Sequence, residues 1–136
     1  MIDLESLSVG ATITAALAGM ITGALWYSPI LFGNAWMNAL GKTADQLGPI
    51  GPAMGGSLLA CALSALTIEF VTIACGVSGL SAGLGIGAIL GVGLVAMAML
   101  SDSLFCGWGW RLYWIQAGYR VTYLILMGGI CGAWPR

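Results

Sequence analysis

Four long stretches of apolar residues constrain this chain more than any other feature of its sequence. They extend over about residues 9–27, 53–75, 80–104 and 112–134. A helix needs about 20 mostly apolar residues to cross the hydrocarbon core of a bilayer, so each stretch is long enough for one crossing. The sequence therefore predicts an all-α integral membrane protein in which residues 1–136 form one domain with four transmembrane helices.

Composition supports this location. Hydrophobic residues make up 60% of the 136 residues and charged residues 7%, whereas about 25% of the residues in ordinary soluble domains are charged. The four basic residues are scattered and the net charge is −1, so the chain has no basic patch for nucleic acid. The partners that we expect are the lipid bilayer and other membrane-embedded helices, and not nucleic acid.

The connection after the first stretch has a pattern of its own. Pro29 ends the first helix because proline disfavours helical backbone at the residue before it. Phe32, Trp36 and Leu40 then recur every four residues, a spacing that places apolar side chains on one face of a helix. We expect a short amphipathic helix at about residues 30–41, lying in the membrane interface.

Aromatic residues gather at the connections that face away from the termini. The interface anchors that we predict are Trp26, Tyr27, Pro29, Phe32, Trp36, Trp108, Trp110 and Trp114. Tryptophan and tyrosine prefer the level of the lipid headgroups. This face also carries Lys42 and Arg111, whereas the face with the termini carries Arg136. The excess of basic residues favours a topology with both termini outside the cytoplasm.

Small residues at four-residue spacing form the most frequent motif. They are Gly19 and Gly23 in the first stretch, Gly79, Gly83, Gly87 and Gly91 in the third, and Gly128 and Gly132 in the fourth. Residues four apart share a helix face, and glycine lets two helices approach closely in lipid. We expect these faces to pack helices together, either within one bundle or against a second copy or a larger membrane complex.

Ionisable residues inside the apolar stretches are the second notable feature. Glu69 and Arg120 each cost about 2.5–3.5 kcal/mol at the centre of a membrane helix, so we expect them to face protein or water and to be paired. Arg120 has two candidate partners, Glu69 and Asp102. Three further polar residues share a broad helix face with Arg120, namely Gln116, Tyr119 and Tyr123. This face could present hydrogen-bond donors to an anion or a lipid headgroup.

Residue patterns typical of catalysis are missing from the sequence. The chain has no histidine, the usual general base and the commonest metal ligand. Its four cysteines form no C-x-x-C pair, and no phosphate-binding glycine loop precedes a Lys-Ser or Lys-Thr pair. We therefore expect no catalytic residue, no metal site and no cofactor.

One run of residues is specific enough to suggest a family. Residues 26–36 follow the pattern W-Y-S-P-x-L-F-G-x-x-W, and Ala117-Gly118-Tyr119, Met127-Gly128 and Trp134 follow later. With these residues the chain resembles a family of small bacterial four-span membrane proteins catalogued as a domain of unknown function. The resemblance implies a four-span fold in the bacterial inner membrane, and it implies no mechanism.

These observations lead to two functional expectations. The first is a non-enzymatic structural or accessory membrane subunit, because the chain has much sequence suited to close helix packing and little suited to chemistry. The alternative is a small homo-oligomeric carrier or channel in which Glu69, Asp102 and Arg120 line a polar path.

Overall fold

A computed structural model describes residues 4–136, which form helices and connecting turns without any strand. The α-helices are α1 (Val9–Trp26), α2 (Gly33–Leu40), α3 (Ile50–Ala74), α4 (Leu80–Leu90), α5 (Met97–Cys106) and α6 (Trp110–Ala133). Short 3-10 turns occur at Leu4–Ser6 and Ala44–Gln46, and a π-helical segment, Gly91–Ala96, joins α4 to α5. The expected all-α class is confirmed, and the long helices begin and end within three residues of the apolar stretches.

Three helical units are long and apolar enough to cross a membrane. They are α1, α3 and the continuous helix Leu80–Cys106, which comprises α4, the π segment and α5. The chain therefore has the helices of a membrane protein. The fourth expected span, α6, is 24 residues long but is not among the three. Polar residues such as Gln116 and Arg120 lower its hydropathy.

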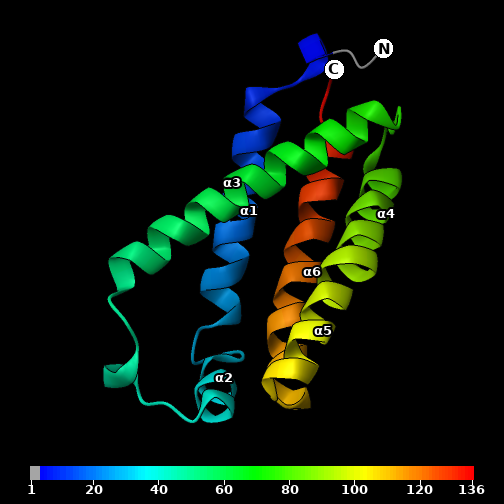
Figure 1. Ribbon diagram of the computed structural model, residues 1–136. Coiled ribbons are helices and arrows are strands. Elements are labelled where there is room, and N and C mark those ends of the chain that lie inside the picture. Colours follow the sequence, from blue (N-terminus) through cyan, green and yellow to red (C-terminus); the bar gives the residue numbers. More distant parts are fainter. Residues whose placement is uncertain (1–3) are drawn as a thin grey trace.

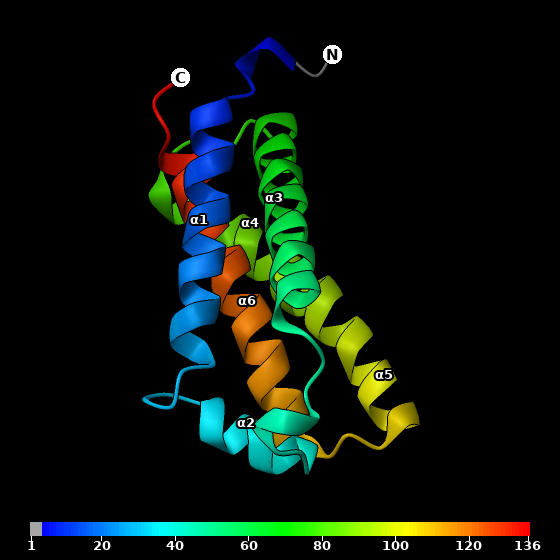
Figure 2. The ribbon, with the colours of Figure 1, turned by 90° about the vertical axis from the view of Figure 1, so that its left-hand side faces the viewer.

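The helices form a bundle around α6. This helix packs against α1, α3 and α4, and more weakly against α2 and α5. Figure 1 shows α3 crossing the other long helices obliquely, so that its first half lies away from α4 and α5. The turn Leu4–Ser6 and the end of α6 lie at one end of the bundle, and α2 lies at the opposite end (Figures 1 and 2).

Local sequence explains where α1 and α2 begin and end. The Ser8 side chain caps α1 by accepting the Ala11 N–H at 3.2 Å, which satisfies one of the free donors of the first turn. At the other end, the Phe32 N–H donates to the Trp26 carbonyl at 2.9 Å, so the chain turns back beneath α1. Gly41 ends α2 with a φ of 66°, a left-handed conformation that favours glycine.

Glycine lets α4 and α6 meet at backbone distance. A Cβ atom added to Gly83 would lie 2.9 Å from the Gly132 Cα, and one added to Gly87 would lie 2.7 Å from the Ile125 Cα. Real Cβ atoms essentially never approach so closely. Four glycines, Gly83, Gly87, Gly128 and Gly132, therefore hold two helices of the same chain together, and substituting them tests folding rather than assembly.

The other small residues have different neighbours. Gly19 faces Met127 and Cys61, Gly23 faces the Tyr119 ring, and Gly91 faces Val121. Gly79 differs, because no atom outside its own neighbourhood lies within 4 Å of its Cβ position. Its role lies in the backbone: a φ of 97° starts α4, and its N–H donates to the Gly132 carbonyl at 2.7 Å.

The π-helical segment has a specific partner on α6. Backbone carbonyls in such segments lose their regular helical partners. Tyr113 is 2% exposed, and its hydroxyl donates to the Ala96 carbonyl at 3.0 Å. The tyrosine therefore satisfies a carbonyl at the end of the π segment and joins α6 to the Leu80–Cys106 helix.

Replacing Tyr113 with phenylalanine tests this contact. We expect the free energy of unfolding to fall by about 1–3 kcal/mol, because the buried Ala96 carbonyl loses its donor while the ring remains. Titration with SDS in mixed micelles measures the loss. Thr67→Val is the control, because the exposed Thr67 hydroxyl donates only to Leu63 of its own helix. An equal stability of Tyr113→Phe and the wild type would contradict the assignment.

Candidate functional site

Glu69 lies on α3, five residues before the helix ends, and its side chain is fully buried. Its Oε1 accepts the Ser8 backbone N–H at 2.6 Å, and its Oε2 accepts the Thr12 hydroxyl. Ser8 is the N-cap of α1, so the carboxyl group also lies at the positive end of the helix dipole. Both oxygens are thus satisfied without a cationic side chain, and they bind the start of α1 to α3.

Arg120 lies half-buried near the middle of α6. Its Nη1 donates to the Gln116 carbonyl at 3.4 Å, so the side chain points back toward the start of α6. The guanidinium also lies close enough to Tyr27 for its positive charge to act on the Tyr27 hydroxyl. Burial raises the pKa of Tyr27 above its ordinary value, and the nearby positive charge opposes this rise.

The structure forms neither of the ion pairs that the sequence suggested for Arg120. Glu69 is bonded to residues at the start of α1, while the Arg120 guanidinium points toward the end of the bundle that holds Tyr27 and α2. Asp102 is exposed on α5. The helical rise separates Glu69 from Arg120 in depth, and the backward lean of the arginine side chain increases that separation.

Aromatic rings connect α2 to α6 across the end of α1. The Tyr27 ring lies 5.2 Å from Trp36 and 5.3 Å from Tyr119, and the Tyr119 ring lies 4.9 Å from Tyr123. The Tyr119 hydroxyl donates to the Gly19 carbonyl at 3.3 Å. Three of the predicted polar residues, Arg120, Tyr119 and Tyr123, thus lie in one region of the bundle together with Tyr27.

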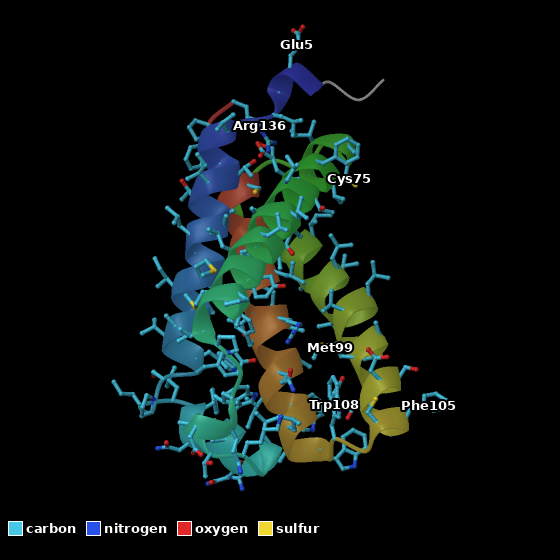
Figure 3. The ribbon with its side chains drawn as sticks, turned by 60° about the vertical axis from the view of Figure 1, so that its left-hand side comes forward. Glu5, Cys75, Met99, Phe105, Trp108 and Arg136 are labelled. Carbon is cyan, nitrogen blue, oxygen red and sulfur yellow. The ribbon has the colours of Figure 1, made fainter. Side chains whose placement is uncertain are left out.

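The predicted interface anchors divide into buried and exposed groups. Trp26 joins two helices, because its Nε1–H donates to the Ile115 carbonyl at 2.9 Å and its ring lies 4.7 Å from Phe32. Trp108 packs against the core around Met99 between α5 and α6, whereas Phe105 projects away from the bundle (Figure 3). The exposed anchors are Pro29, Phe32, Trp110 and Trp114.

A cavity of about 340 Å³ lies between α1, α3 and Tyr119 of α6. Its lining residues are Met20, Gly23, Ala24, Tyr27, Met54, Ser57 and Tyr119. The lining is largely apolar, with three hydroxyl groups. A second cavity of about 280 Å³, between α3 and the π segment, is lined mainly by leucine, isoleucine and valine side chains. The first cavity is the candidate site, because it combines a polar wall with an adjacent cation.

The sequence could not indicate several residues of these contacts. Ser8, Thr12 and Ser57 are ordinary small polar residues of a membrane helix or its cap, and only the packing of α3 against α1 gives them partners. Within residues 4–136, no group of three cysteine, aspartate or glutamate side chains is arranged to hold a metal ion. The described polar residues are therefore best considered as hydrogen-bonding groups.

Comparison with known proteins gives one match. No curated protein and no solved structure is significantly similar to the chain. The family described as Protein of unknown function (DUF1761) matches residues 10–132, which include the W-Y-S-P-x-L-F-G-x-x-W run and the helices around the cavity. The resemblance noted from that run is thereby confirmed, and the chain belongs to the DUF1761 family of proteins of unknown function.

Proposed function

We propose that this protein is a four-span membrane protein with a structural, non-enzymatic role, acting as an accessory subunit that packs against a second copy of itself or a larger membrane complex. Two features support this role: the length and position of α6, and an exposed helix surface on α3.

We assign α6 as the fourth membrane span. Its 24 residues correspond to a length of about 36 Å, enough to cross a bilayer. It runs beside the Leu80–Cys106 helix between the same two ends of the bundle (Figure 1). Its low hydropathy agrees with its central position, because the polar side chains Tyr113 and Tyr119 donate to backbone carbonyls of other helical segments.

The remaining topology follows from this arrangement. The α2 helix lies at the end of the bundle opposite the termini, so we assign it to the membrane interface, where Trp36 would lie at the headgroup level. Lys42 and Arg111 belong to that end and Arg136 to the other. The positive-inside rule then favours a bacterial inner-membrane protein with both termini outside the cytoplasm.

The proposed function rests mainly on the first half of α3, which is exposed along its whole length. Every residue in 50–60 is exposed, in contrast to Cys61 and Ala65, which are buried in the bundle. This half contains Gly51, Gly55 and Gly56, and in the part of the chain that the structure describes no atom beyond their own helical turns lies within 4 Å of a Cβ position on any of them. Small residues spaced for close helix packing, without a neighbour in the chain, favour a helix of another subunit as their partner.

The alternative, a carrier or channel, needs Glu69, Asp102 and Arg120 along one polar path. Glu69 is enclosed by contacts from α1, Asp102 is exposed on α5, and Arg120 lies beside Tyr27. The described contacts give these groups separate surroundings, so the packing proposal is the better supported of the two.

Substitution of Gly55 with leucine tests the proposal. We expect wild-type protein in gentle detergent to have a fixed ratio to further copies or to other membrane chains by native mass spectrometry, and Gly55→Leu to be monomeric with an unchanged helix content. Leucine at this exposed position removes the close approach without touching the rest of the chain. Gly93→Leu is the control, because Gly93 is also exposed and has no neighbour within 4 Å. A monomeric wild type, or a Gly55→Leu variant that keeps the full assembly, would refute the proposal.

A further inference from the structure

Arg120 is a cation without a carboxylate partner among residues 4–136. Its Nη1 donates to the Gln116 carbonyl, and its charge acts on the nearby Tyr27. A charged group in a membrane helix is costly unless it is paired or hydrated. The guanidinium has five N–H donors in a planar fork that suits carboxylate and phosphate groups. An anion bound beside Tyr27 would therefore be stabilised by this positive charge.

The 340 Å³ cavity lies next to this cation. Arg120 is not one of its lining residues, but Tyr27, on which the Arg120 charge acts, is one of them. Ser57 and Tyr119 line the same space, and the Tyr119 hydroxyl already donates to the Gly19 carbonyl. The Tyr27 and Ser57 side chains therefore provide hydroxyl donors for an anion, and the positive charge of Arg120 lies near Tyr27.

The remaining lining residues of the cavity, and its level in the membrane, indicate which other groups the ligand should have. Met20, Ala24 and Met54 form an apolar surface. These lining residues come from the last turns of α1 and the first turns of α3, which lie toward the α2 end of the bundle. In a protein with the membrane topology proposed above, this is the level at which the polar groups and first acyl carbons of a phospholipid lie.

We propose that this cavity binds the phosphodiester group of an anionic phospholipid from the leaflet on the α2 side. Arg120 supplies the positive charge, Tyr27 and Ser57 supply hydroxyl donors, and Met20 and Met54 contact the first carbons of the acyl chains. Basic pockets between membrane helices bind anionic lipid headgroups in this manner. The volume, about 340 Å³, suits the phosphoglycerol part of such a lipid and leaves the acyl chains in the bilayer.

This site is distinct from the bare surface of α3. Successive residues of a helix are rotated by about 100°, so Gly55 points away from the cavity that Met54 lines. A lipid in the cavity and a helix against Gly55 occupy different faces of α3. The lipid proposal rests on the membrane topology but not on assembly, so a monomeric protein would leave it intact.

The test measures the lipid that the purified protein retains. Wild-type protein is exposed to mixed vesicles of phosphatidylglycerol and phosphatidylcholine, extracted in gentle detergent and examined by native mass spectrometry. We expect retention of phosphatidylglycerol at least tenfold above phosphatidylcholine, and loss of this preference in Arg120→Gln. Arg111→Gln is the matched control, because it removes the same charge from an exposed position on the same helix and should keep the preference. Equal retention of both lipids by the wild type, or an unchanged preference in Arg120→Gln, would overturn the proposal.

Two further experiments test whether the cavity binds a lipid headgroup. Tyr27→Phe keeps the ring and removes only the hydroxyl, so we expect a weaker preference for phosphatidylglycerol even if Arg120→Gln fails to fold. An excess of inorganic phosphate should not displace the bound lipid, because the apolar walls contribute to binding. Complete displacement by inorganic phosphate would show that the site takes a free anion, and it would overturn the assignment to lipid.

Discussion

Replacing Gly87 with alanine is expected to lower the free energy of unfolding by more than about 3 kcal/mol. The new methyl group would lie 2.7 Å from the Ile125 Cα and would also collide with the Leu124 carbonyl. Both groups belong to the α6 backbone, which cannot move aside as a flexible side chain can. Forcing extra atoms into a packed core costs about 1–3 kcal/mol, and more where the backbone must shift. The helices would have to separate along the contact that Gly83 and Gly128 share.

Gly85 provides the matched control for this prediction. It lies on the same helix, two residues away, and has no neighbour within 4 Å of its Cβ position. Gly85→Ala should therefore cause no loss of stability and should raise it by up to about 1 kcal/mol, because alanine favours a helix over glycine. SDS titration in mixed micelles, followed by tryptophan fluorescence, compares the two variants. An equal loss in both would mean that the close approach of α4 to α6 does not govern the effect.

Replacing Glu69 with alanine is expected to release the start of α1. The Ser8 N–H and the Thr12 hydroxyl would both lose their acceptor, at a cost of about 1–3 kcal/mol for each donor left without a partner. The fully buried side chain would also leave a cavity. Hydrogen exchange should become faster in the first turn of α1, and SDS titration should show the lower stability.

Two comparisons separate the hydrogen bonds of Glu69 from its volume. Glu69→Gln keeps the size of the side chain and one acceptor oxygen, so its loss of stability should be smaller than that of Glu69→Ala. Thr12→Val removes only the hydroxyl donor, and faster exchange should again begin at the first turn of α1. The assignment would fail if Glu69→Ala unfolded the protein uniformly while exchange in α1 remained as slow as in the wild type.

The helices, the membrane character and the family could be predicted from the amino-acid sequence alone. Hydropathy is summed over neighbouring residues, so long apolar stretches mark α1, α3 and the Leu80–Cys106 helix without any knowledge of packing. The run that begins at Trp26 is likewise local, and it indicated the family that the comparison confirmed. The sequence did not indicate the π segment, whose Ala96 carbonyl accepts the Tyr113 hydroxyl only when α6 packs beside it.

The contacts between residues of different helices follow from the packing of the bundle. The rotation of α4 turns Gly83 and Gly87 toward α6 of the same chain, although the same spacing would suit a second subunit. The packing of α1 against α3 gave Glu69 two donors in place of the expected arginine. The oblique course of α3 left a cavity beside Tyr27 and Arg120. Such contacts depend on the tilt and rotation of whole helices, which neighbour packing sets and which a pattern within one helix does not encode.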